Sequence, residues 1–235
     1  MIRLIGFDAD DTLWDNELAF ALTQTKFRQI LSRFHSHEWI DARLLETERR
    51  NVELFGYGAK GFALSMIETA IELTEGRITG SELQVILDAV RTMLSDPVAP
   101  LAGVREVLHD LRGAYPLLLI TKGDLYEQEA KIARSGLGEL FASVEIVSEK
   151  SCDKYKALLR KHSLSSDEFL MVGNSVKSDI LPVLELGGYA AHIPYSLTWQ
   201  YEFAEPPVSH PRLASLRSMQ ELPGVVRRLN CEALA

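Results

Sequence analysis

Short apolar runs that alternate with helical patterns are the feature that most restricts the fold of this chain. Each run has about the length of one buried parallel strand, and the stretches between the later runs have room for one helix. Strands that alternate with helices in this way predict βαβ units, and hence a doubly wound parallel sheet with helices on both faces. The predicted strands are Ile2–Phe7, Pro116–Thr121, Val144–Ser148, Phe169–Gly173 and Tyr189–Ile193.

Capping and turn residues indicate where the helices between the later strands begin and end. Asp124 is suited to cap a helix that runs through Arg134 and stops at Gly136. Two further helices are predicted over residues 153–162 and 177–186. The last part of the chain, from Pro206 to Ala235, is ambiguous, and its apolar stretches at 213–219 and 225–229 are candidates to cover one edge of the core.

Residues 15–97 break the alternation and show only helical spacing. Ser81 and Gln84 stand in capping-box positions, and Pro97 and Pro100 end the helical block. We therefore expect a smaller, all-helical domain over 15–97, inserted into an α/β core formed by 1–14 and 98–235. Apolar residues three and four apart mark its helices: Phe27, Ile30, Leu31 and Phe34, then Leu64, Ile67 and Ile71, then Leu83, Ile86, Leu87, Val90 and Leu94.

Charge and cysteine content narrow the range of partners. The formal net charge is −8, and no long basic run occurs. Nucleic acid and anionic membranes are therefore not expected as partners, since both require clustered lysine and arginine. Cys152 and Cys231 lack CxxC spacing and matching histidines, which favours reduced thiols over a disulfide or a zinc site. An acid appears too early for a signal peptide, and no apolar run approaches membrane-spanning length, so we expect a soluble, cytoplasmic protein.

Acidic residues crowd the end of the first predicted strand, in the sequence Asp8-Ala9-Asp10-Asp11-Thr12. Like charges this close repel each other, so they do not serve stability. A divalent cation resolves the conflict, and Mg²⁺ prefers such hard oxygen ligands. Ligand sites of open α/β sheets lie beyond the carboxyl ends of the strands, where these acids fall. An acidic turn after a strand is the simpler alternative.

The ends of the other predicted strands supply further polar groups. Thr121 and Lys122 end the second strand before a glycine, and a hydroxyl, an ammonium and a flexible amide at a helix N-terminus suit a phosphate. Lys150 follows the third strand, and Asn174 and Asp179 follow the fourth. Successive strand ends thus supply acids, a hydroxyl, a lysine and oxygen ligands, which predicts one site for an anion together with a metal ion.

This ordered set resembles the motifs of the haloacid dehalogenase-like superfamily, and the similarity extends over nearly the whole chain. The first motif, DxDxT, matches residues 8–12, and the second, a Ser or Thr at the end of the next core strand, matches Thr121. The third, a lysine, falls at Lys150, and the fourth, an acidic GDxxxxD-type segment, falls at 173–179. Asn174 replaces the usual Asp there, with weaker Mg²⁺ binding as the expected consequence. The helical insertion resembles the cap of one subclass.

The resemblance implies a Mg²⁺-dependent phosphatase that acts on a small phosphorylated metabolite. Asp8 is the implied nucleophile, which forms an aspartyl-phosphate, and Asp10 is the implied general acid and base. The implied phosphate-binding residues are Thr121, Lys122 and Lys150. The implied metal ligands are Asp8, the main-chain carbonyl of Asp10, Asn174 and, through water, Asp179. Lys154 and Lys156 are rivals for the place of Lys150, but they fall inside a helical pattern that favours a solvated face.

Three other functions remain open. A haloacid dehalogenase shares the aspartate nucleophile, although a departing halide needs no acid at Asp10. Phosphoryl transfer to another hydroxyl, as in a mutase, is not distinguished by the sequence. The third alternative is a non-catalytic binding protein on the same fold, and the intact Asp8 and Asp10 argue against it.

A glycine-rich segment at 56–61 matches the dinucleotide-binding pattern GxGxxG. It follows a helical pattern instead of a strand, so the structural context of that motif is missing. A flexible cap loop is the better interpretation, and Tyr57 and Lys60 are then candidates either to touch the leaving group of a substrate or to face solvent.

Overall fold

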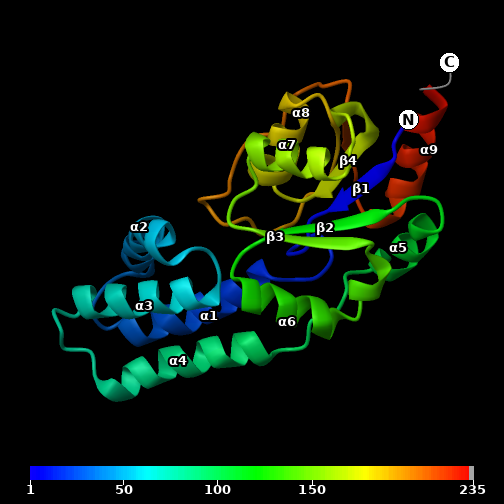
Figure 1. Ribbon diagram of the computed structural model, residues 1–235. Helices are drawn as coiled ribbons and strands as arrows, with labels where there is room; N and C mark the ends of the chain where they lie inside the picture. Colours follow the sequence, from blue (N-terminus) through cyan, green and yellow to red (C-terminus); the bar gives the residue numbers. More distant parts are fainter. Residues whose placement is uncertain (233–235) are drawn as a thin grey trace. The chain divides into compact units, whose positions relative to one another are not determined.

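The computed structural model of the protein describes residues 1–232 and contains one six-stranded parallel sheet (Figure 1). The strand order is β3-β2-β1-β4-β5-β6, so the first strand of the chain lies inside the sheet between β2 and β4. The predicted doubly wound α/β fold is confirmed. Its sheet extends to a short edge strand, β6, that the sequence did not mark. The strands are β1 Leu4–Phe7, β2 Leu117–Lys122, β3 Ser143–Val147, β4 Phe169–Gly173, β5 Tyr189–His192 and β6 Leu213–Ser215.

Contacts divide the chain into two compact units. The core unit contains residues 1–15, 98–122 and everything described from Gln128 onward, and the helical unit contains 16–97 and 123–127. The end of the predicted core, residues 233–235, lies outside the described residues. No described helix is long and apolar enough to cross a membrane.

Alternate side chains of the strands build the two faces of the core unit, as the period of a strand requires. Ile5 and Leu119 belong to an apolar cluster with helices α5 and α9, whereas Leu118 and Met171 pack with α7. Both faces are therefore covered by helices, which explains why the strands are apolar throughout. The helices of this unit, one of which begins in residues of the other unit, are α5 Val104–Arg112, α6 Leu125–Ser135, α7 Cys152–Lys161, α8 Leu181–Glu185 and α9 Leu222–Glu232.

The helical unit has a hydrophobic core of its own. Phe27, Leu31, Ile40, Met66 and Ile86 are buried together in it. The predicted helices are present. In α3, however, the buried residues include Met66, while other apolar side chains of that helix stay exposed. The helices are α1 Glu17–Leu31, α2 His37–Phe55, α3 Ala59–Leu73 and α4 Gly80–Ser95.

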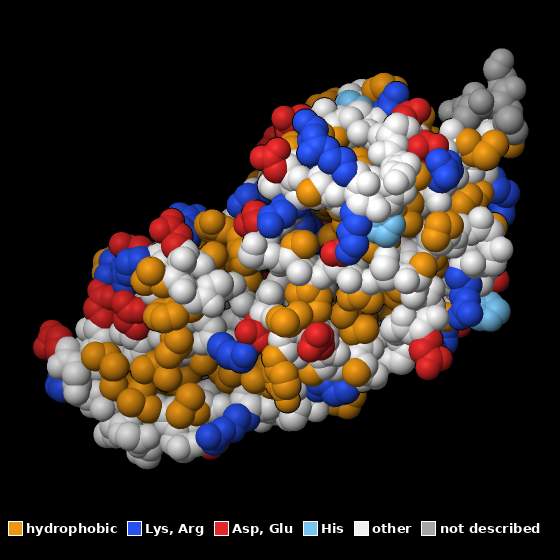
Figure 2. All heavy atoms as spheres, viewed as in Figure 1, with side chains coloured by type: hydrophobic (Ala, Val, Ile, Leu, Met, Phe, Trp, Pro, Cys, Tyr) orange, Lys and Arg blue, Asp and Glu red, His pale blue; other side chains and the backbone are white. Residues whose placement is uncertain are grey.

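Exposed hydrophobic side chains gather over the helical unit in the view of Figure 2. Leu22, Leu54 and Phe55 are among the most exposed of the large apolar residues there. The amphipathic helices of this unit are thus incompletely covered by one another.

One local prediction was wrong in position, and another was right in position but differs in helix type. The capping box of α4 is formed by Thr79 and Glu82, not by Ser81 and Gln84. The Thr79 hydroxyl accepts from the Glu82 amide at 3.3 Å, and the Glu82 carboxylate accepts from the Thr79 amide at 2.8 Å, so the helix begins two residues earlier than predicted. The predicted helix over 177–186 is a π-helical turn, Val176–Ile180, followed by α8.

Candidate active site

The predicted site residues lie at the carboxyl edge of the sheet because parallel strands all end on that side. Asp8 follows β1, Thr121 and Lys122 end β2, and Asn174 follows β4. The strand order places β1 between β2 and β4, so these three loops are neighbours. The order of the strands in the sheet reverses next to β1, and open α/β sheets bind ligands at such a switch point.

A buried lysine bridges two buried carboxylates at the centre of this edge. The ammonium of Lys150 donates to Oδ1 of Asp8 and, at 2.7 Å, to Oδ1 of Asp179. Burial raises the pKa of Asp8 to about 7, although Lys150 acts in the opposite direction. Burial alone would lower the pKa of Lys150, but Asp179 and Asp8 hold it above its ordinary value, so the lysine stays charged. The cluster therefore carries two acids and one permanent cation.

A glycine makes room for the acid of the fourth motif. A Cβ atom on Gly173 would lie 2.2 Å from Oδ2 of Asp179, so any larger residue at the end of β4 would displace this carboxylate. The Ser175 amide donates to the same Oδ2 at 3.0 Å. Asp179 is thus fixed against the main chain of the loop that carries it.

Thr12 connects Asp8 to Asn174. Its hydroxyl lies 2.9 Å from Oδ2 of Asp8 and 3.2 Å from Oδ1 of Asn174, and it accepts from the Asn174 amide at 3.1 Å. The threonine of the DxDxT sequence therefore connects the loop after β1 to the loop after β4 through hydrogen bonds. Asp11, which precedes Thr12 in the same turn, has a left-handed backbone with φ of 62°. Asp tolerates this conformation better than most residues.

Asp10 is held by three donors that the sequence did not predict. Its carboxylate accepts from Trp14 Nε1 at 2.7 Å, from Gln128 Nε2 at 2.9 Å and from Lys131 Nζ at 2.9 Å. Burial tends to raise the pKa of Asp10, but Lys131 and the hydrogen bonds lower it below its ordinary value. Gln128 and Lys131 are one turn apart on α6 and both buried. Their burial is a property of the folded chain, so the sequence carried no signal for this pair.

The two residues predicted to bind phosphate at the end of β2 differ in their surroundings. The hydroxyl of Thr121 is buried and has no hydrogen-bond partner among the described residues. A buried hydroxyl without a partner is costly, so this oxygen is suited to a ligand. Lys122 instead donates to Glu202 at 2.7 Å and to the Ser178 hydroxyl at 3.3 Å. Glu202, which comes from the segment between β5 and β6, had no signal in the sequence.

The donor chemistry of the site suits a small hard cation. The carboxylates of Asp8 and Asp179 both bind the Lys150 ammonium. The side-chain amide oxygen of Asn174 is linked to Asp8 by the Thr12 hydroxyl, which lies close to both. No group of three or more His, Cys, Asp and Glu side chains in the described chain is arranged as a metal cluster. The side-chain donors are two carboxylates and an amide oxygen, which is the kind of set that Mg²⁺ takes when water and substrate oxygens complete its shell.

Comparison with known families agrees with the order of these residues along the chain. A family model described as haloacid dehalogenase-like hydrolase matches residues 2–187. The chain belongs to the haloacid dehalogenase-like hydrolase family. The matched range contains all four motifs, the whole helical unit and the part of the core unit up to residue 187. No curated protein matches the chain.

Solved structures resemble this chain over nearly its whole length. A haloacid dehalogenase-like family hydrolase from Xanthomonas campestris is 43% identical with a TM-score of 0.89, over 99% of this chain and 93% of that one. A predicted phosphoglycolate phosphatase from Haemophilus somnus is 18% identical with a TM-score of 0.63, over 96% and 98%. A 2-haloacid dehalogenase from Pseudomonas syringae is 20% identical with a TM-score of 0.63, over 97% and 99%. The last two share the fold.

The glycine-rich segment at 56–61 joins two helices. Gly56 ends α2 and Gly58 precedes α3, so the strand that a dinucleotide-binding motif requires is absent at this position. Within the helical unit, Lys60 pairs with Asp124 at 2.9 Å.

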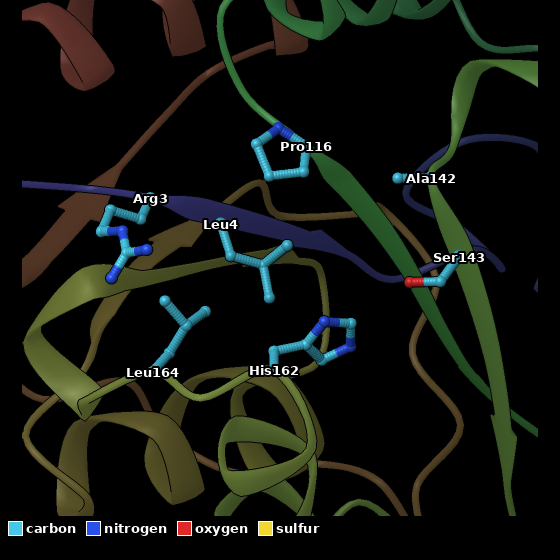
Figure 3. A pocket seen from close by; sticks show the side chains of 7 residues that line it. All are labelled: Arg3, Leu4, Pro116, Ala142, Ser143, His162 and Leu164. Atoms are coloured by element: carbon cyan, nitrogen blue, oxygen red, sulfur yellow. The ribbon is translucent and has the colours of Figure 1, made fainter.

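A separate hollow of about 360 Å³ lies at the opposite edge of the core sheet (Figure 3). Leu4 and Ser143 begin strands β1 and β3, and Pro116 precedes β2, so the hollow faces the amino ends of the strands. None of the family motifs contributes to its lining, which consists of Arg3, Leu4, Pro116, Ala142, Ser143, His162 and Leu164. The hollow is therefore not the site of the motif residues.

Proposed function

We propose that this hydrolase cleaves a small phosphate monoester, with Asp8 as the nucleophile and Asp10 as the general acid and base. The observation that carries the proposal is the Asp10 carboxylate, fixed by three donors two residues after the nucleophile. The alkoxide that leaves a phosphate monoester needs a proton, whereas a halide leaves without one. A dehalogenase would have no use for this second acid.

The surroundings of Asp8 suit nucleophilic attack. Thr12 and Lys150 hold one carboxylate oxygen each, which fixes the rotation of the side chain. An oxygen of Asp8 forms the bond to phosphorus while the bond from phosphorus to the leaving oxygen breaks, and an aspartyl-phosphate results. Lys150 and the unpartnered Thr121 hydroxyl are the donors available to the phosphate oxygens. Such donors stabilise the charge that develops on those oxygens.

Asp10 takes part in both steps of the proposed reaction. In the first it gives a proton to the leaving oxygen, and in the second it removes one from the water that attacks the aspartyl-phosphate. Because Lys131 lowers its pKa, most Asp10 is ionised near neutral pH, which suits the second step, and only the small protonated fraction can supply the proton of the first step. We therefore expect aryl phosphates, whose leaving oxygens need little help from an acid, to react faster than alkyl phosphates.

The residues that would hold Mg²⁺ are Asp8, Asn174, Asp179 and the main-chain carbonyl of Asp10. A bound Mg²⁺ supplies positive charge to the phosphate oxygens and to the Asp8 carboxylate. Lys150 already balances one of the two acids, so a divalent cation and a phosphate dianion would enter this site together with little change in net charge.

Release of phosphate and release of halide, measured side by side, test this function. We expect the protein to liberate phosphate from p-nitrophenyl phosphate in the presence of Mg²⁺, and to stop when a chelator is added. Chloride release from 2-chloropropionate should stay at the level of the Asp8→Asn variant, which lacks the nucleophile. Chloride release without phosphate release would overturn the proposal in favour of a dehalogenase. Transfer of phosphate to an added sugar in place of water would indicate a phosphotransferase.

A further inference from the structure

The segment between β5 and β6, residues 193–212, contacts residues that follow β1 and β4 and the last residue of β2. Connections longer than about 12–15 residues without a helix or strand of their own are uncommon and usually functional. Tyr195 donates its hydroxyl to Asp15 at 2.5 Å. Lys177 donates to the Tyr201 carbonyl at 2.8 Å and stands 4.1 Å from the centre of the Tyr201 ring. All of these residues belong to the core unit, so the segment is docked within that unit.

Glu202 makes the most polar of these contacts. One carboxylate oxygen accepts from Lys122 at 2.7 Å. The other accepts from the Ser178 hydroxyl at 2.6 Å and from the Ser175 hydroxyl at 3.2 Å. The side chains of Glu202 and Lys122 are only 15% and 11% exposed, so water screens this pair far less than it screens a surface ion pair. A single carboxylate thus joins the end of β2 to the loop after β4.

The contacts of Glu202 continue to the acid of the fourth motif. Ser175 accepts a hydrogen bond from the Ser178 amide at 3.1 Å, and its own amide donates to Asp179 at 3.0 Å. The stretch 176–180 is a π-helical turn, a form that is rarer and less stable than an α-helix and is often found at functional sites. A turn of this kind needs outside support, and the two serine hydroxyls held by Glu202 provide it.

We infer that Glu202 is a positioning residue, whose carboxylate fixes the turn that carries Asp179 and uses Lys122 as its anchor. The inference rests on the proposed function in one respect, which is that the proposed function gives Asp179 a role in the reaction. It assigns Lys122 to the support of this turn, since the Lys122 ammonium already faces Glu202 and, at 3.8 Å, Glu149. Phosphate is then met by Lys150 and Thr121.

Hydrogen exchange of the metal-free protein tests the inference without any substrate. In Glu202→Ala, the amides of residues 175–179 should exchange about tenfold faster, which corresponds to one lost hydrogen bond. Glu202→Gln, which keeps the shape but loses the charge, should fall between this variant and the parent. Glu205→Gln is the matched control, because Glu205 is exposed in the same segment. Ser178→Ala removes one donor to Glu202 while the acid remains, and it should accelerate exchange by a smaller factor. This variant decides the question if Glu202→Ala does not fold.

A double-mutant cycle tests the role of Lys122. If Lys122 is the anchor of Glu202, Lys122→Met should raise the same exchange rates in the parent, but should add less than about twofold in Glu202→Ala. In the phosphatase assay, Glu202→Ala should require more Mg²⁺ for half-maximal rate and should recover most of its kcat at saturating Mg²⁺.

Two results would overturn the inference. One is exchange at 175–179 in Glu202→Ala that equals that of Glu205→Gln. The other is a rise of the same size in every strand of the sheet, which would show general destabilisation. A parent protein that releases no phosphate would contradict the proposed function, while the exchange rates would still decide the role of Glu202.

Discussion

Replacement of Lys150 by methionine removes the one cation that separates two buried acids. The lysine is 5% exposed and Asp179 is fully buried, so water cannot take over the solvation of the carboxylates. Breaking a buried ion pair by removal of one partner costs about 3–5 kcal/mol, because the remaining charge stays buried without compensation. Asp8 can escape part of this cost by binding a proton, since burial already raises its pKa to about 7. We therefore expect a loss near the lower end of the range, about 3 kcal/mol at pH 7.

The dependence of this loss on pH follows from the direction of the shift. An acid whose pKa is raised in the folded state binds its proton more tightly there, so stability falls as the pH rises from 3.8 through about 7. Without Lys150 the repulsion between Asp8 and Asp179 strengthens this effect. The penalty of Lys150→Met should therefore be larger at pH 8 than at pH 5.

Urea unfolding of the metal-free protein at both pH values measures the penalty. Lys154→Met is the matched control, because Lys154 is exposed on α7, and it should change the free energy of unfolding by less than about 0.5 kcal/mol. Equal effects of the two substitutions, or a penalty of Lys150→Met that grows toward acid pH, would refute the reasoning and the assignment of the third motif to Lys150.

Three further predictions concern neighbours of the site. Asn174→Asp should strengthen Mg²⁺ binding in calorimetric titration, because a carboxylate replaces a neutral oxygen; unchanged or weaker binding would place Asn174 outside the metal shell. Lys131→Met should raise the pKa of Asp10, which NMR titration of its carboxyl carbon measures, and an unchanged pKa would contradict the role of this ion pair. Burial lowers the pKa of His192 from 6.5, and its Nε2–H donates to the Asn174 carbonyl at 3.0 Å. The folded protein therefore loses stability as the pH falls through 6.5. His192→Gln should make the decline of Tm in this pH range less steep than in the parent protein. An equal decline in both proteins would show that His192 does not titrate on unfolding.

The sheet was predictable because its strands are buried on both faces and read as apolar runs. The strand β6 was not, since Leu213–Ser215 is short, lies at the sheet edge and is only partly buried. The capping box failed for another reason: Thr79 and Glu82 have the same spacing as Ser81 and Gln84. Spacing alone does not decide which of two such pairs begins the helix.

The candidate site was predictable where its residues follow strand ends. Asp8 and Lys150 lie at positions that a parallel sheet must bring to one edge, whatever the details of packing. Lys131 and Glu202 reach the site from a helix and from an irregular segment, and nothing local distinguishes them from exposed charges. Their role depends on contacts between residues far apart in the sequence, which only the folded chain reveals.

The central claim, hydrolysis through a phosphate on Asp8, is tested most directly by the mass of the Asp10→Asn variant. This substitution keeps the size of the side chain and removes its proton chemistry. With p-nitrophenyl phosphate, whose leaving oxygen needs little acid help, the first step should proceed and the second should stall. Intact-mass measurement after mixing should then show one added phosphoryl group, which should be absent from Asp8→Asn. Turnover by Asp10→Asn at the rate of the parent protein, or no phosphoryl adduct in a variant that still binds Mg²⁺, would contradict the account.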